Sequence, residues 1–136
     1  KAKDRFQRAL TIASDDANKQ KCYTMLYEIA YKRKNYKEAY RIANSMSDNC
    51  TANEKKARII ASSANDCGAS SLERSLVYCL ALEYAEKSCG KISVATVNSW
   101  TGSLLPKKDL IMLDVVNGTD QQVKCWNSTV KLRTRD

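Results

Sequence analysis

The chain has 136 residues, 43% of them hydrophobic, and a formal net charge of +8 at pH 7. This length and apolar content suit one ordinary folded domain and argue against disorder. His is absent, which excludes imidazole bases, Ser-His-Asp triads, Cys-His dyads and His-ligated zinc within these residues. With four Gly, one Pro and no phosphate-loop motif, nucleotide chemistry is not expected either.

Residues 1–105 are predicted to form a helical repeat domain, because they contain no Pro and few Gly. The spacing of apolar residues and the polar residues between the apolar segments predict five helices in chain order, at about 1–14, 17–33, 36–46, 51–68 and 71–90. The first ends at the cluster Ser14-Asp15-Asp16. The fourth begins with a capping box of Thr51 and Glu54 and ends at Gly68 as a left-handed cap, and the fifth follows Ser70 or Ser71. Residues 92–104 are predicted as a sixth helix, although their β-branched residues also suit a strand.

Residues 106–136 are predicted to form a small β-rich cap packed on these helices. Leu110 to Val116 is a β-prone run, Asn117-Gly118 is a hairpin-turn signal, and 122–126 supplies a second strand. Alternation of apolar and charged residues over 129–133 predicts a third. The cap is therefore expected as a β-hairpin or a three-stranded sheet, with Trp100 and Trp126 buried at the junction.

Apolar positions repeat at intervals of about 34 residues, which indicates a helical-repeat array. Tyr23, Leu26 and Ala30 recur 34 residues later as Ala57, Ile60 and Ala64. The alternative is that any two amphipathic helices share such a stripe. Asn35-Tyr36-Lys37-Glu38-Ala39 resembles the inter-helix turn and second-helix start of a tetratricopeptide repeat. Ala2, Phe6 and Ala9 match the second helix of a preceding repeat, which puts the start of the chain inside a repeat.

Degenerate repeats followed by a tail containing Val123-Lys124-Cys125-Trp126-Asn127 resemble exported tetratricopeptide-like proteins of certain Gram-negative anaerobes. The pattern is degenerate, since Tyr27 replaces a small residue, Ala30 an aromatic one, and the terminal Pro is missing. The resemblance implies a mainly α, right-handed solenoid of antiparallel helix hairpins. It also implies export to the periplasm or cell surface, with a signal outside these residues.

The same resemblance implies a scaffold whose concave groove, lined by first helices, binds a segment of another protein or peptide. Position by position, it assigns these groove residues: Lys21, Thr24, Glu28, Tyr31, Arg58, Ser62 and Asn65. The alternative for this set is the solvated face of ordinary helices.

A basic cluster suggests an alternative function, the binding of a polyanion such as nucleic acid or an anionic surface. It gathers around one predicted helix link and contains Lys32, Arg33, Lys34, Lys37 and Arg41. Nucleic acid is the less favoured partner, because base-stacking aromatics are not interleaved with these charges. A weaker third hypothesis places a carbohydrate-contact surface around Trp126.

The six Cys residues include no C-x-x-C pair, so neither a tetrathiolate zinc site nor a thioredoxin-type redox pair is predicted. An even count is compatible with disulfides in an oxidising compartment, and fifteen pairings are possible. The alternative is that several Cys are small buried hydrophobes, as the apolar surroundings of Cys22 and Cys79 favour. We expect no enzymatic activity, metal, cofactor or membrane span, and the sequence specifies no oligomeric state.

Overall fold

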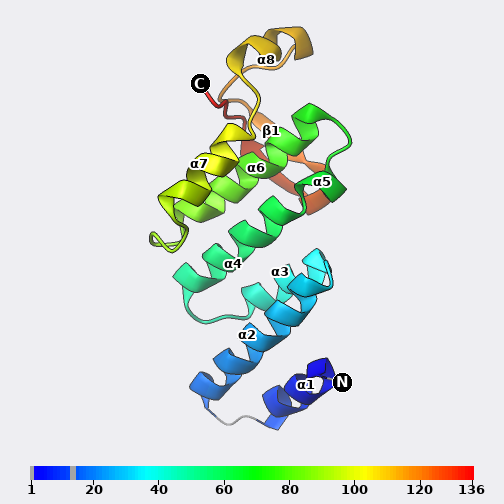
Figure 1. Ribbon diagram of the computed structural model, residues 1–136, viewed down its shortest axis with the longest axis vertical. Helices are drawn as coiled ribbons and strands as arrows, with labels where there is room; N and C mark the ends of the chain where they lie inside the picture. The colour runs from blue at the N-terminus through cyan, green and yellow to red at the C-terminus, as the bar shows by residue number, and fades with distance from the viewer. Residues whose placement is uncertain (1, 13–14) are drawn as a thin grey trace.

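The computed structural model describes residues 2–12 and 15–136 and is mainly helical, with a small sheet near the C-terminus. The helices are α1 Ala2–Ile12, α2 Asp16–Lys32, α3 Tyr36–Asn44, α4 Asn49–Ser62, α5 Ala64–Cys67, α6 Ser71–Glu86, α7 Val94–Gly102 and α8 Lys107–Leu113. The strands β1 Asp120–Val123 and β2 Ser128–Lys131 pair antiparallel and are joined by a 3-10 helix, η1 Lys124–Trp126. The helices succeed one another along the long axis, with the sheet beside α6 and α8 beyond it (Figure 1).

The helical prediction is confirmed in its coarse form, but several boundaries differ. α6 begins at the expected place, because the Ser70 hydroxyl accepts a hydrogen bond from the Glu73 backbone N–H at 3.1 Å. The capping box of Thr51 is wrong, since α4 begins earlier with Asp48 as its N-cap. The Thr51 hydroxyl instead donates to the Asp48 carboxylate at 2.7 Å. The cluster expected to end the first helix includes Ser14, which lies outside the described residues.

Gly68 is not the left-handed cap that the sequence suggested. Its backbone is extended, with φ −107° and ψ 118°, because the fourth helix is interrupted at Ser63 and the single turn α5 follows. Glycine is needed there by a close approach: a Cβ on Gly68 would lie 2.7 Å from the Arg74 backbone nitrogen. Two residues in the left-handed region, Cys89 (φ 57°) and Gly90 (φ 76°), instead follow the end of α6 at Glu86.

The predicted strand at Leu110 to Val116 is wrong, because Lys107–Leu113 forms α8. Pro106 occupies its N-cap position, and the Lys, Leu and Met residues that follow are good helix formers. Leu110 alone is buried, whereas Ile111 and Met112 are 84% and 89% exposed. A segment with a single buried side chain has no periodic burial pattern that distinguishes a strand from a helix. The prediction therefore rested on β-propensity alone, which was wrong here.

The three-stranded alternative for the cap is therefore wrong, and the sheet is a two-stranded hairpin. Its register pairs Gln121 with Val130 and Val123 with Ser128. The connection is η1, completed by Asn127 in the left-handed region, and not the Asn117-Gly118 turn expected. Gly118 instead extends the pairing, since its N–H donates to the Leu132 carbonyl oxygen at 2.8 Å.

The main hydrophobic core joins the helices and the C-terminal segment, and a smaller cluster contains Ala57, Ala85 and Ile92. The most deeply buried large side chains include Tyr27 from α2, Ile59 and Ile60 from α4, and Leu132 from the segment after β2. Trp126 is buried as expected, at 9% exposed, whereas Trp100 is only partly buried. The C-terminal residues thus complete a core that the helices leave open on one side.

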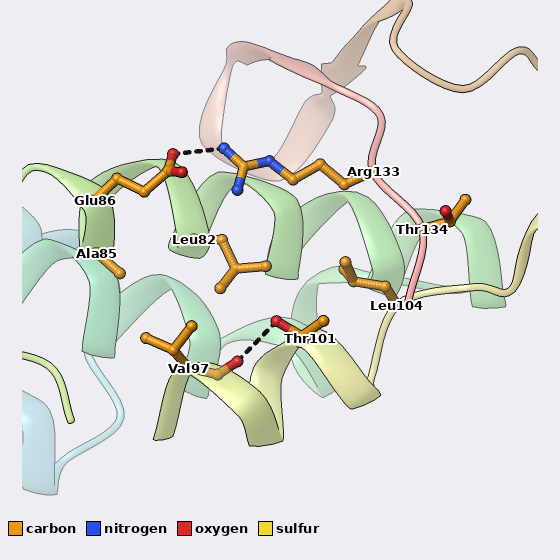
Figure 2. A pocket seen from close by; sticks show the side chains of 8 residues that line it. All are labelled: Leu82, Ala85, Glu86, Val97, Thr101, Leu104, Arg133 and Thr134. Atoms are coloured by element: carbon orange, nitrogen blue, oxygen red, sulfur yellow. Dashed lines mark hydrogen bonds and ion pairs between the residues drawn. The ribbon is translucent and has the colours of Figure 1, made fainter. Parts of the chain in front are cut away.

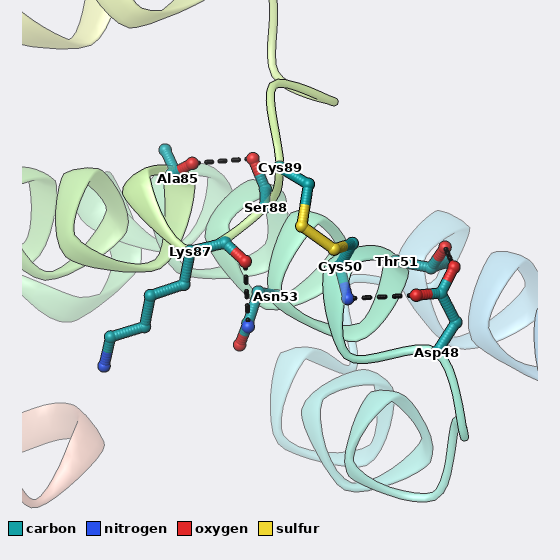
Figure 3. The surroundings of a disulfide bond; sticks show 8 residues. All are labelled: Asp48, Cys50, Thr51, Asn53, Ala85, Lys87, Ser88 and Cys89. Atoms are coloured by element: carbon teal, nitrogen blue, oxygen red, sulfur yellow. Dashed lines mark hydrogen bonds between the residues drawn. A yellow bond between two sulfur atoms is a disulfide. The ribbon is translucent and has the colours of Figure 1, made fainter.

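Two disulfides fasten the chain, Cys50–Cys89 and Cys67–Cys125. The first joins the start of α4 to the turn after α6 (Figure 3), and the second joins α5 to η1. Cys22 and Cys79 are buried free thiols. Both sequence interpretations of the cysteines are thus partly right, with four residues paired and two acting as small core residues. Within the described residues, the helices include none whose length and apolarity suit a membrane crossing.

Candidate binding surface

Three of the seven groove residues assigned from sequence come together in the structure. Tyr31 from α2 and Arg58 and Ser62 from α4 line a shallow hollow of about 320 Å³. Tyr78 from α6 and two residues of α7, Thr96 and Trp100, complete its lining with Ala61. Four helices therefore contribute to one solvent-open surface, which we call the interhelical hollow.

The wall formed by α2 and α4 is held by direct contacts. The Tyr31 hydroxyl and the Ser62 hydroxyl lie 2.5 Å apart and form a hydrogen bond between the two helices. Arg58 Nε donates to the Glu54 carboxylate at 2.8 Å, one turn earlier on α4. This contact uses one of the five guanidinium N–H groups and orients the side chain. The hollow thus offers aromatic faces, hydroxyls and a positioned cation.

The Tyr31 ring packs against the buried ring of Tyr27. Tyr27, 1% exposed, lies with its ring centroid 5.8 Å from that of Tyr31. Its hydroxyl donates to the Lys55 carbonyl oxygen at 3.0 Å, and burial strongly raises the pKa of Tyr27. Tyr27 therefore stays neutral and packs against Tyr31 from within the core.

The other four predicted groove residues do not line this hollow. Lys21 is exposed on α2, and the Thr24 hydroxyl donates to the Gln20 carbonyl oxygen within the same helix. Glu28 lies 4.0 Å from Lys55 in an ion pair. Asn65 borders a neighbouring hollow that shares Tyr78.

Sequence reasoning missed four lining residues, Ala61, Tyr78, Thr96 and Trp100. Trp100 was expected in the core, and Tyr78 lies on a helix whose apolar stripe masked its partial exposure. The available signal was spacing: Thr96 and Trp100 are four residues apart on a predicted helix and share one face of it.

The predicted basic cluster divides into two parts. Lys32, Arg33 and Lys34 are exposed at the end of α2 and in the turn after it. Lys37 instead packs 4.1 Å from the centroid of the Trp126 ring and donates to the Cys125 carbonyl oxygen, and burial lowers its pKa. Arg41 pairs with Glu38 at 2.6 Å.

A second concave site was not predicted. It measures about 230 Å³ and lies between α6, α7 and the residues after β2 (Figure 2). Leu82, Ala85, Val97 and Leu104 form its apolar walls. An ion pair of 2.6 Å between Arg133 and Glu86 closes one side. Because these two charged side chains of the lining neutralise each other, the site fits an apolar side chain better than an ion.

The comparisons with known proteins give no relative for this chain. No protein-family model, curated protein or solved structure matches it. Within residues 2–12 and 15–136, no group of three or more His, Cys, Asp or Glu side chains is placed to hold a metal ion. The surfaces described above therefore have to be interpreted from their own geometry and chemistry.

Proposed function

We propose that this chain is a protein-interaction scaffold of the helical-repeat type, whose interhelical hollow receives a segment of a partner protein. One observation carries the proposal: residues assigned to a groove from the sequence, Tyr31, Arg58 and Ser62, converge with side chains of two further helices on one open surface. The tetratricopeptide resemblance supports the same use, because such arrays bind partner segments along their first helices.

The chemistry of the lining favours a partner segment with an apolar side chain and a carboxylate. Trp, Tyr and Arg are the residues most enriched among those that dominate binding energies in interfaces, and Trp100, Tyr78 and Arg58 all line the hollow. The rings provide apolar contact area, while the free guanidinium N–H groups provide charge-assisted hydrogen bonds. A hollow of about 320 Å³ suits one or two side chains.

We also propose that the protein is exported and works in an oxidising compartment. The two disulfides support this, because disulfides persist outside reducing compartments. A C-terminal cap that is covalently attached to the helices suits a protein exposed to extracellular proteases, since it limits local opening.

The test is selection of a random peptide library on the oxidised chain, followed by affinity measurements on one enriched peptide. Arg58→Ala and Trp100→Ala are each expected to lower the affinity for the peptide by about 30-fold, which is the effect of removing a side chain that dominates an interface. Arg33→Ala is the matched control, because it removes an exposed arginine outside the hollow.

Thermal unfolding of the same variants separates binding from folding. Arg58→Ala and Trp100→Ala are expected to keep a melting temperature close to that of the parent chain, because both side chains are only partly buried. Unchanged peptide affinity in both variants, or a melting temperature as low as that of the core variant Ile60→Ala, would contradict the assignment of the hollow.

A further inference from the structure

A cluster of lysines and tyrosines lies where α3, α4 and α6 meet. Lys56 Nζ is 5.3 Å from the ring centroid of Tyr40 and 5.6 Å from that of Tyr84. Lys87 Nζ is 5.7 Å from the Tyr84 centroid. We call Tyr40, Lys56, Tyr84 and Lys87 the lysine–tyrosine cluster. It is separate from the interhelical hollow, because two residues along α4 correspond to about 200° of rotation, which turns Lys56 away from Arg58.

The side chains of this cluster are held in place by contacts between elements. The hydroxyls of Tyr40 and Tyr84 form a hydrogen bond of 2.8 Å, and their rings meet edge to face with centroids 6.3 Å apart. Asn53 Nδ2 donates to the Lys87 carbonyl oxygen at 3.1 Å. The Cys50–Cys89 disulfide ties the turn after Lys87 to α4 (Figure 3). The two lysines, 31 positions apart in the chain, are therefore held close together before any ligand binds.

Within the described residues, neither lysine forms an ion pair. Glu83, which lines a shallow hollow together with Lys87, accepts a hydrogen bond from the Lys131 backbone N–H. The carboxylates nearest in sequence have other partners: Glu54 pairs with Arg58, and Glu86 pairs with Arg133. Burial lowers the pKa of Lys56, and the neighbouring charge of Lys87 lowers it further. The ring faces attract the ammonium groups, but the partial loss of hydration at Lys56 and its repulsion by Lys87 cost free energy. An anion bound between the two lysines offsets that cost.

The hydroxyl pair adds a further donor. A hydrogen bond between two hydroxyls uses one of the two O–H protons, so the other remains for a ligand. Burial and the hydrogen bond to Tyr84 raise the pKa of Tyr40, which keeps this phenol protonated and able to donate. Two ammonium groups and one phenol O–H match the several acceptor oxygens of a tetrahedral oxyanion.

We propose that the lysine–tyrosine cluster is a binding site for a doubly charged oxyanion group, a phosphate or sulfate ester. The ligand lies between the ammonium groups of Lys56 and Lys87 and accepts a hydrogen bond from the tyrosine pair. This site differs in place and in residues from the exposed basic group Lys32, Arg33 and Lys34. It is also independent of the peptide-binding role of the hollow.

The first experiment measures thermal unfolding with inorganic phosphate or sulfate, against chloride at matched ionic strength. Anions that bind the folded chain raise its melting temperature with a saturable dependence on concentration. The variant Lys56→Gln with Lys87→Gln is expected to weaken the apparent affinity by about tenfold or more, because two charge-assisted contacts are lost. The control Lys32→Gln with Arg33→Gln removes the same net charge from exposed positions and is expected to keep the parent affinity.

Equal losses in both double variants would overturn the proposal, since they would show a dependence on net charge alone. A parent chain stabilised no more by phosphate or sulfate than by chloride would overturn it as well. If Lys56→Gln with Lys87→Gln does not fold, Lys87→Gln alone replaces it, because Lys87 is exposed and Lys56 then remains in place. Retained parent affinity in that single variant would also contradict the site.

The source of the oxyanion is distinguished by three probes measured on the same variants: a sugar phosphate, a sulfated polysaccharide, and vesicles containing phosphatidic acid. A drop in affinity confined to Lys56→Gln with Lys87→Gln identifies the source that uses this site. If none of the three probes distinguishes that variant from its control, the proposal fails.

Discussion

The helices up to α7 and the C-terminal segment both contribute to the main core, but through contacts of different range in the sequence. Each helix from α1 to α7 packs mainly on near neighbours in the chain, as in α1 with α2 and α2 with α3. The C-terminal segment instead reaches far back: the Trp126 indole N–H donates to the Ser63 hydroxyl across 63 positions. The helical part is therefore encoded locally, whereas the position of the segment is encoded by a few long-range contacts.

Cys79 shows how the two regions join. The backbone N–H of Arg133 donates to the Cys79 sulfur at 3.4 Å, and the thiol donates to the Arg133 carbonyl oxygen at 3.8 Å. Burial raises the pKa of the Cys79 thiol, which keeps it protonated and able to make both contacts. A buried cysteine of α6 thus takes the place of a neighbouring strand for this residue.

Breaking the covalent link between the two regions is expected to have the largest effect. The pair Cys67→Ser with Cys125→Ser opens a loop of sequence separation 58, and we expect a loss of about 4 kcal/mol in the free energy of unfolding. Urea denaturation measures this loss. We also expect residues 106–136 to become protease-sensitive while the far-UV helical signal persists.

The control for this experiment is Cys50→Ser with Cys89→Ser, which opens a loop of sequence separation 39. Because the entropy of loop closure grows only with the logarithm of length, its loss is expected to be similar, about 4 kcal/mol. In the control, however, residues 106–136 should stay protected from protease. Equal protease sensitivity in both pairs would contradict the role assigned to Cys67–Cys125.

A smaller loss is expected when the hydrogen bond between the regions is removed. Ser63→Ala leaves the buried Trp126 N–H without its acceptor, which costs about 2 kcal/mol in the free energy of unfolding. Ser88→Ala is the matched control. Like Ser63, Ser88 is buried and its hydroxyl donates to a carbonyl three residues earlier. The difference is that the Ser63 hydroxyl also accepts the hydrogen bond from Trp126.

Adding Trp126→Phe to both serine variants sharpens this comparison. Phenylalanine has no N–H to satisfy, so the difference between Ser63→Ala and Ser88→Ala should disappear in that background. The double-mutant cycle is measured by urea denaturation. A difference of unchanged size in the Trp126→Phe background would show that Ser63 acts through α4 alone.

The smallest expected effect is a pH dependence confined to the helical part. The hydrogen bond from Arg41 lowers the pKa of Glu38, with a further contribution from the charges of Arg41 and Lys3. A lowered folded-state pKa stabilises the protein above the unfolded value of about 4.3, and this stabilisation is lost as pH falls through the folded value. For a pair this exposed, with Arg41 65% accessible, the effect is about 0.5 kcal/mol or less.

Urea denaturation of the parent and of Glu38→Gln at pH 7 and pH 2.5 measures this effect. The parent should be slightly more stable at pH 7, and the difference should become smaller at pH 2.5, because the stabilisation is lost as Glu38 takes up a proton. A larger difference at the lower pH would reverse the expected sign. Protease sensitivity of residues 106–136 should be the same in both chains, since the Glu38 carboxylate is hydrogen-bonded to Arg41 within α3.

The predictable part of the molecule is the part whose signals are local. Ser70 with Glu73 marked the start of α6, and regular apolar spacing placed α2 and α3 within a few residues. The prediction for the residues of α8 was wrong because Leu110 is the single buried side chain of this helix, so the sequence has no apolar periodicity to detect there. The disulfide pairs could not be derived at all, because spacing alone does not determine which half-cystines meet in space.

The sites follow the same division. Tyr31, Arg58 and Ser62 were assigned to the groove from the tetratricopeptide resemblance, and the structure brings these three side chains to one hollow. Trp100 was missed because an aromatic residue beside a small-residue stripe is equally typical of a core. Lys56 and Lys87 were missed for a different reason: each alone belongs to an ordinary charged helix face, and only the packing of α4 against α6 brings them together.

The order of the two disulfides along the chain also sets its mechanical behaviour. Cys67 lies inside the loop closed by Cys50 and Cys89, whereas Cys125 lies outside it, so the loops interlock. The shortest covalent route from Cys50 to Cys125 then has only 67 − 50 = 17 residue steps and the second disulfide, compared with 125 − 50 = 75 steps in the reduced chain. At ~3.4 Å per extended residue, a pulling force extends the oxidised protein about 200 Å less. Under tension, the extensible part of the molecule is then the segment before Cys50, with α1 to α3, together with the 17 steps from Cys50 to Cys67.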